Sequence, residues 1–175
     1  MTDLVEKDVT DPAVDQWGSF MPALLTILAC TRGPVLEVGI GHYSTPVLHA
    51  ICRAEKRELI SLEDNVAWEK AIFSRYCGEG HNILPGTYDE WIPLLAQRKW
   101  SVALLDHSPG QRRATDLAIL AESVDYFVVH DFHAAIEAAF STTLQGFNFH
   151  VTRRRLPPTL VASRHCTIPD GILAL

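Results

Sequence analysis

The sequence lacks a surplus of positive charge, a long apolar run and a closely spaced pair of cysteines. Its 175 residues contain 15 Lys and Arg against 21 Asp and Glu, a formal net charge of −6. Proteins that bind polyanions gather Lys and Arg on one face, so nucleic acid is not an expected partner. No stretch reaches the roughly 18 apolar residues that span a bilayer, and the polar start has no signal-peptide core. We therefore expect a cytoplasmic protein with no membrane partner.

The cysteines are few and far apart. Four of them, Cys30, Cys52, Cys77 and Cys166, stand without a CxxC pair, so we expect reduced packing residues. The chain has the length of one ordinary globular domain. We expect a single domain over residues 1–175, in which residues 1–18 form an acidic lead. Trp17 and Phe20 could close over a ligand as a lid or serve as a packing staple.

The chain does contain a regular alternation of apolar runs and amphipathic segments. Strands are expected at 34–41, 58–64, 81–86, 101–107 and 125–132, and helices at 19–33, 44–56, 65–78, 87–99, 112–124 and 134–146. Continuous apolar strands between amphipathic helices predict an α/β fold with a doubly wound, mostly parallel sheet and helices on both faces. Residues 147–164 hold two β-like runs whose connection is too short for a crossover helix, which predicts an antiparallel hairpin.

A glycine turn follows the first strand, in the stretch "VLEVGIGHYSTP". Gly39 and Gly41 match the first two glycines of a dinucleotide fingerprint, but Ser44 stands where the third would fall. Ser44 or Thr45 can cap the helix that follows, with Pro46 in its first turn. In a doubly wound sheet the ligand lies beyond the carboxyl ends of the strands. The turn is therefore the expected ligand site.

Two acids narrow the choice of ligand. Glu37 would repel the phosphates of NAD, but it could pair with an ammonium group, directly or through backbone and water. Glu63 ends the second strand, where an acid accepts the hydroxyls of a ribose. S-adenosyl-L-methionine has both an amine and a ribose, so a site with one acid for each of these groups suits it as the ligand. An NAD-linked oxidoreductase is the alternative, which Glu37 and Ser44 disfavour.

These motifs resemble those of the class I (Rossmann-like) S-adenosylmethionine-dependent methyltransferases, whose seven-stranded sheet ends in an antiparallel hairpin. "LEVGIGHYST" is similar to the first motif of the family and "LISLEDN" to the second. Two further stretches are similar to catechol O-methyltransferase-like enzymes. "PGTYDEWIPLL" implies that Tyr88 and Asp89 lie beside the adenine, and "ALLDH" implies that Asp106 and His107 lie near the cofactor and acceptor.

The chain departs from the catechol-type enzymes at their metal site and their catalytic lysine. That site uses an Asp at the fourth strand and an Asp-Asn pair at the fifth. Asp106 and Asp131 match, but Phe132 stands at the Asn position and Pro109 at that of the lysine. We therefore assign no metal.

Candidate bases for methyl transfer follow the fourth and fifth strands. We single out Asp131, His133 and His107, any of which could take the acceptor's proton. Two other interpretations stay open. Asp106, Asp131 and a histidine could hold a divalent ion, or Asp131 could cap the next helix while the histidines, including His130, are ordinary loop residues.

The remaining signals are weaker. Arg112 and Arg113 are expected on a solvated helix face, although they could orient an acidic acceptor. Trp68 is expected in the helix-to-sheet core or in the adenine-side wall. The sequence thus predicts an S-adenosylmethionine-dependent methyltransferase for a small-molecule or peptidyl oxygen or nitrogen acceptor. The alternative is a non-catalytic cofactor-binding or assembly module of the same fold. With no separate acceptor domain, a second subunit of a homodimer could complete the acceptor site.

Overall fold

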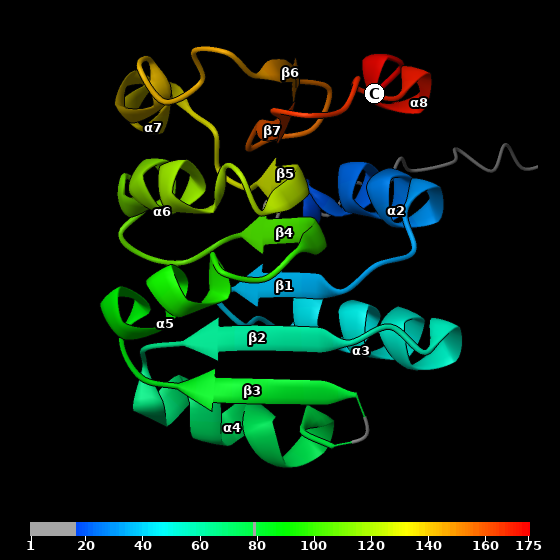
Figure 1. The fold of residues 1–175 in the computed structure, drawn as a ribbon, viewed down its shortest axis with the longest axis vertical. Helices are drawn as coiled ribbons and strands as arrows, with labels where there is room; N and C mark the ends of the chain where they lie inside the picture. Colours follow the sequence, from blue (N-terminus) through cyan, green and yellow to red (C-terminus); the bar gives the residue numbers. More distant parts are fainter. Residues whose placement is uncertain (1–16, 79) are drawn as a thin grey trace, which may run out of the picture.

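The computed structural model describes residues 17–78 and 80–175. Its seven strands form one sheet in the order β3-β2-β1-β4-β5-β7-β6 (Figure 1). The strands are β1 (Val35–Val38), β2 (Leu59–Glu63), β3 (His81–Pro85), β4 (Trp100–Leu105), β5 (Val124–Val129), β6 (Asn148–Thr152) and β7 (Thr159–Ser163). The helices are α2 (Met21–Cys30), α3 (Ser44–Glu55), α4 (Val66–Tyr76), α5 (Tyr88–Leu95), α6 (Arg112–Leu120), α7 (Ala134–Phe140) and α8 (Asp170–Leu173).

The pairing of the strands confirms the predicted sheet. Strands β1 to β5 pair in parallel, whereas β7 is antiparallel to both β5 and β6. The order reverses between β1 and β4, which is where a doubly wound sheet opens a crevice for a ligand. None of the helices in the described part of the chain is long and apolar enough to cross a membrane.

Helices cover both faces of the sheet, with α5, α6 and α7 on one side and α2, α3 and α8 on the other (Figure 1). Successive side chains of a strand point to opposite faces. In β1, Leu36 and Val38 accordingly join the core beneath α5 and α6, and Val35 joins the core beneath α2 and α3. By the same alternation Glu37 points toward α3, a placement that decides its role in the site.

Most predicted elements are confirmed, but several bounds and details differ, and α5 and α6 each end four residues before the predicted bound. Helix α7 ends at Phe140, short of the predicted residue 146, and the four-residue helix α8 was not predicted. The predicted side-chain cap of α3 is wrong, because its N-cap is Tyr43 and no side chain caps it. Pro46 does lie in the first turn. Most of the predicted acidic lead, residues 1–16, lies outside the described residues.

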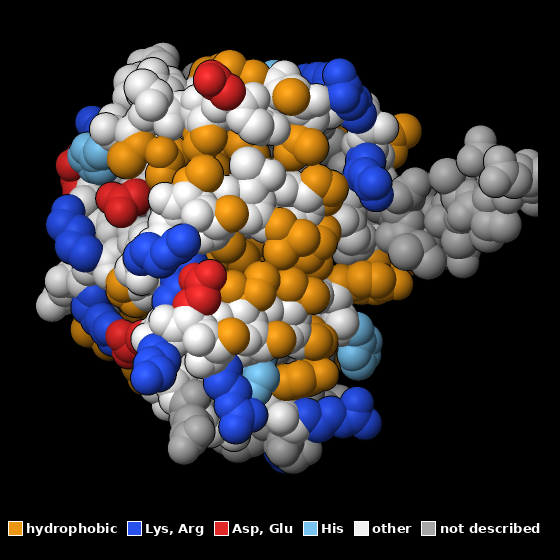
Figure 2. Space-filling model, turned by 90° about the vertical axis from the view of Figure 1, so that its right-hand side faces the viewer, with side chains coloured by type: hydrophobic (Ala, Val, Ile, Leu, Met, Phe, Trp, Pro, Cys, Tyr) orange, Lys and Arg blue, Asp and Glu red, His pale blue; other side chains and the backbone are white. Residues whose placement is uncertain are grey.

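The face that carries α2, α3 and α8 has hydrophobic side chains gathered across its middle (Figure 2). Leu25 of α2 and Leu173 of α8 are among the exposed large hydrophobic residues, at 40% and 55% exposure. Exposed apolar area of this kind is typical of surfaces that bind a partner. The homodimer remains a prediction, and this face is where it can be tested.

Candidate functional site

The turn between β1 and α3 is held against the end of β4. Gly39 has a φ of 91°, and a Cβ placed there would lie 2.7 Å from the Asp106 carbonyl carbon and oxygen and from the His107 nitrogen. Only glycine fits such a backbone-to-backbone approach at positive φ. The next glycine differs, since Gly41 donates its N–H to Thr45 Oγ1 at 2.9 Å and has room for a Cβ. The first glycine is therefore required by packing, and the second keeps space open at the site.

Glu37 lies beneath this turn, fully buried on the side of α3. Its carboxylate accepts hydrogen bonds from Thr45 Oγ1 at 3.0 Å and Ser61 Oγ at 2.5 Å. Burial raises the pKa of Glu37 to about 7, against the lowering effect of the hydrogen bonds from Ser44, Ser61 and Thr45. Glu37 does not line the pocket described below, so the predicted direct contact with an ammonium group is wrong in this structure. An indirect influence through the turn stays a prediction.

Glu63 ties the turn to β2. Its two carboxylate oxygens accept the N–H groups of Ile40, at 3.2 Å, and Asn65, at 2.8 Å. Burial raises the pKa of the Glu63 carboxyl, although both backbone hydrogen bonds act in the opposite direction. Trp68 covers the turn from α4, donating its indole N–H to the Ile40 carbonyl at 2.8 Å. The side of the turn expected to meet a ribose is thus built from Glu63, Ile40 and Trp68.

A pocket of about 440 Å³ opens beside the turn, at the carboxyl ends of β1, β4 and β5. Its lining residues are Trp17, Phe20, Ile40, Gly41, His42, Tyr43, Ser44, Trp68, Asp106, Ser108, Arg113, His130 and Asp131. The pocket lies where ligands bind in this class of sheet. Trp68, which is 37% exposed, belongs to the ligand wall instead of the core. Trp17 and Phe20 bring the segment before α2 to the pocket, as a lid requires.

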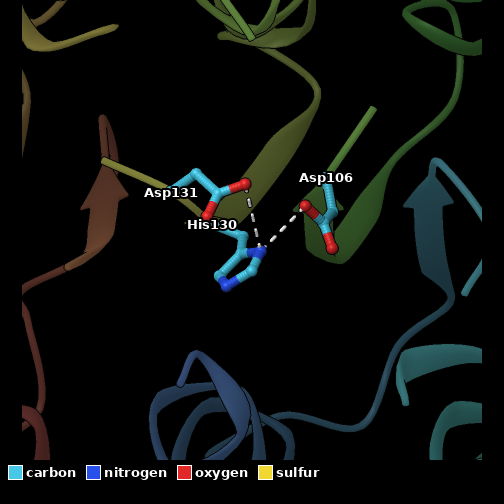
Figure 3. Close-up of side chains that lie close together, drawn as sticks. All are labelled: Asp106, His130 and Asp131. Carbon is cyan, nitrogen blue, oxygen red and sulfur yellow. Dashed lines mark hydrogen bonds and ion pairs between the residues drawn. The ribbon is translucent and has the colours of Figure 1, made fainter. Parts of the chain in front are cut away.

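Three polar side chains meet at the far end of the pocket (Figure 3). His130 Nδ1 lies 2.9 Å from Asp106 Oδ1 and 3.6 Å from Asp131 Oδ2. His130 is 2% exposed, whereas the Asp131 side chain is 37% exposed. Asp131 also has a φ of 53°, a left-handed conformation that Asp tolerates better than most residues. Asp131 is therefore the carboxylate of this cluster that a ligand reaches most easily.

Several predicted site residues lie outside the pocket. His107 is buried, with its Nε2 2.7 Å from Asp116 Oδ2 and its ring against that of Tyr88, so it cannot reach an acceptor. Tyr88 is itself buried and turned into the core beside α6. Asp89 pairs with Arg112 on the outside of α5. His133 is the exposed N-cap of α7 and is absent from the pocket wall. The histidines that do line the pocket are His42, in the β1–α3 turn, and His130, after β5.

Arg113 is 4% exposed and lines the pocket, so the predicted solvated face is wrong at this position. It donates from Nε to the His107 carbonyl at 2.8 Å and from Nη1 to the His130 carbonyl at 2.6 Å. No local pattern could have identified it, because Arg is rarely buried and its partners come from two different strand ends. The partners of Arg113 lie close to it only because β4 and β5 are neighbours in the sheet.

Comparisons with sequence families and with curated proteins find no match. Solved structures match in fold. Human methyltransferase-like protein 13 in complex with SAH is 12% identical, with a TM-score of 0.62 over 89% of this chain and 86% of that one. Magnesium protoporphyrin IX methyltransferase (ChlM) from Synechocystis PCC 6803 with bound SAM is 18% identical, with a TM-score of 0.53 over 91% and 86%.

A mutant of MtNAS is 12% identical, with a TM-score of 0.54. The match covers 90% of this chain and 66% of that one, so the chain spans slightly less than two thirds of its length. At these identities the matches show the fold, which is that of the class I S-adenosylmethionine-dependent methyltransferases. They give no support for the oxidoreductase alternative.

Proposed function

We propose that this chain binds S-adenosyl-L-methionine beside the β1–α3 turn and transfers its methyl group to an oxygen or nitrogen of a small-molecule or peptidyl acceptor. The observation that carries the proposal is the pocket at the carboxyl ends of β1, β4 and β5, which joins the glycine turn to an accessible carboxylate. Solved neighbours of the same fold, such as ChlM, have SAM bound.

The turn and α3 supply the cofactor contacts in this proposal. Gly41 and Ser44 line the pocket at the start of α3, whose first turn carries no acidic residue. The N-terminus of a helix favours a negative group, here the carboxylate of the cofactor's methionine part. Trp68 lines the ribose and adenine side of the pocket, and Glu63, which is outside the pocket wall, supports that side through its hydrogen bond from the Ile40 N–H. Tyr88 and Asp89 have no role in this scheme, because neither faces the pocket.

The acceptor end of the pocket has to remove a proton from the acceptor. S-adenosylmethionine supplies an electrophilic methyl group, which leaves sulfur with the bonding electron pair staying on the sulfur. The protein has to align the acceptor and remove the proton that its nucleophilic atom loses. Asp131 is placed to accept that proton. Arg113 and His130 contact Asp131 and fix its position, and both side chains also contact Asp106.

Titration calorimetry tests the cofactor assignment. S-adenosylmethionine and S-adenosylhomocysteine are expected to bind with micromolar dissociation constants, of the order typical for enzyme ligands, and NAD is expected to give no heat. Binding of NAD in place of the other two would contradict the proposal. Cofactor binding with no methyl transfer to any of a broad set of hydroxyl and amine acceptors would favour the non-catalytic module instead.

Asp131→Asn tests the proton acceptor. Asn keeps the size of the side chain and tolerates the left-handed backbone, so the fold should be retained. We expect the turnover number to fall by about 10²- to 10⁴-fold, because the amide cannot take a proton. The measurement is release of S-adenosylhomocysteine with an acceptor found in the screen, alongside calorimetry of cofactor binding, which should change little. His133→Ala is the matched control and should leave turnover unchanged. Unchanged turnover in Asp131→Asn would remove Asp131 from this role.

A further inference from the structure

The donor atoms at the ends of β4 and β5 are of the kind that divalent metals bind. One ligand atom from each of Asp106, His130 and Asp131 lies within 4.8 Å of the other two (Figure 3). Carboxylate oxygens and imidazole nitrogen suit several divalent ions. Whether a metal fits here depends on what these three side chains already contact.

A buried guanidinium faces the same carboxylates. Arg113 Nη2 lies 3.3 Å from Asp106 Oδ1, and Arg113 Nη1 lies 3.7 Å from Asp131 Oδ2. The same side chain holds the carbonyls of His107 and His130, so it joins the loops after β4 and β5. A buried guanidinium requires such paired acceptors, since an uncompensated buried charge is strongly unfavourable. Asp106 and Asp131 are thus already paired with a cation, the guanidinium of Arg113, at the ends of β4 and β5.

Both ring nitrogens of His130 already have partners within the protein. Ser19 Oγ donates its only hydrogen to the Pro157 carbonyl at 2.7 Å, so at 3.2 Å it accepts from His130 Nε2. His130 Nδ1 faces the Asp106 carboxylate at 2.9 Å, a contact that needs a proton between the two atoms. Both ring nitrogens of His130 are therefore engaged within the protein, and a metal would have to displace one of these two partners.

We infer that the guanidinium of Arg113 is the resident cation of this site, and that it positions Asp106 and Asp131 for a methyl transfer that uses no divalent metal. The inference rests on the proposed function for its catalytic meaning. It separates this chain from the catechol-type enzymes that its motifs resemble. A site without a metal does not chelate two adjacent oxygens, so an acceptor with one hydroxyl or amine facing Asp131 is sufficient.

Manganese binding tests the inference without any acceptor. Wild-type protein titrated with Mn²⁺ and followed by electron paramagnetic resonance is expected to show no site in the micromolar range. Arg113→Ala is expected to bind Mn²⁺ at least tenfold more tightly, because Asp106 and Asp131 lose the cation that pairs with them. Arg112→Ala is the matched control. Arg112 pairs with Asp89 and Asp116 outside the cluster, so its loss should leave Mn²⁺ binding as in the wild type.

Arg113→Lys is a second variant for the case in which Arg113→Ala does not fold. It keeps the positive charge but loses the planar guanidinium fork. It is expected to bind Mn²⁺ as weakly as the wild type. Stoichiometric Mn²⁺ binding by the wild type that disappears in Asp106→Asn would overturn the inference, as would a folded Arg113→Ala protein that gains no Mn²⁺ site. Calorimetry with S-adenosylhomocysteine reports on the proposed function separately, and EDTA should leave that binding unchanged.

Discussion

Gly39→Ala is expected to destabilise the protein by about 4 kcal/mol or more, a large part of the stability of an ordinary domain. The added Cβ would lie 2.7 Å from three backbone atoms of Asp106 and His107, and backbone cannot move aside as a flexible side chain does. The φ of 91° adds conformational strain for any residue with a Cβ. Urea unfolding followed by circular dichroism measures the loss. A midpoint equal to that of the wild type would contradict the close packing of the turn on β4.

Gly41→Ala is the matched control for that substitution. Its φ lies outside the left-handed region, and a Cβ there would meet only Ser44 Oγ, at 3.4 Å. The free energy of unfolding should therefore change by less than about 1 kcal/mol. Because Gly41 lines the pocket, the added methyl group should nevertheless weaken S-adenosylhomocysteine binding by about tenfold or more, measured by calorimetry. The pair of variants separates a glycine needed for folding from a glycine needed for the ligand.

The contribution of Glu37 to the free energy of unfolding is expected to fall as pH rises from about 4.5 to about 7, whereas that of His81, whose pKa burial lowers to about 4, is expected to rise over much of the same interval. Glu37 has a pKa of about 7 in the fold and a value of 4.5 when unperturbed, so over this interval the folded protein holds a proton that the unfolded chain has lost. The contribution of Glu37 to stability is therefore fully present below its pKa in the unfolded chain. It is lost as the pH rises through its pKa in the folded protein. The total loss is about 3 kcal/mol, from about 1.4 kcal/mol for each pKa unit.

The neighbours of Glu37 leave this charge uncompensated. Thr45 and Ser61 donate neutral hydrogen bonds, and the charge of Asp106 raises the pKa of Glu37 further. His81 follows Ser61 in the same hydrogen-bonded chain, at 2.9 Å from Ser61 Oγ, and burial lowers the pKa of His81 to about 4. His81 is therefore neutral near pH 7, and no cation of these groups stabilises the ionised carboxylate.

Urea unfolding at about pH 5 and about pH 8 measures this dependence. Relative to the wild type, the free energy of unfolding of Glu37→Gln should rise by about 3 kcal/mol between the two pH values, since the amide does not titrate. The pH dependence that remains in both proteins comes from groups such as Glu63, whose pKa burial raises, and His81, whose pKa burial lowers. Glu58→Gln is the control, at an exposed acid that pairs with Arg98. An equal slope in the wild type and Glu37→Gln would show that Glu37 is ionised throughout.

Much of the fold could be predicted because its signals are local. The apolar run before Gly39 and the cap-like, proline-containing start of α3 lie within a dozen residues, and they place a strand, a turn and a helix correctly. The terminal hairpin follows from the length of its connection alone. Helix α8 has four residues, which is too short for an amphipathic period to be recognised.

The directions of the site side chains could not be predicted, because strand alternation stops where the loops begin. His107 and His130 each follow the end of a strand, yet one turns to Asp116 and the other to the pocket. The difference comes from partners distant in the sequence: Asp116 of α6 for His107, and Phe20 and Ser19, which precede α2, for His130. The direction of the Glu37 side chain could have been predicted from strand alternation, since Val35 and Glu37 share the face that meets α3.

The single hydroxyl of Ser19 has a consequence for how the protein is made. Ser19 joins His130 to Pro157, a residue 138 positions further along the chain, and Phe132 donates to the Pro158 carbonyl at 2.8 Å in the same turn. Both contacts need the connection between β6 and β7. While a ribosome is still synthesising that hairpin, the first five strands can already pair, but the Ser19 hydroxyl beside His130 and the N–H of Phe132 both lack their acceptors. The pocket should therefore become competent for ligand only late in synthesis, and a nascent chain stalled before residue 157 is expected not to retain S-adenosylhomocysteine.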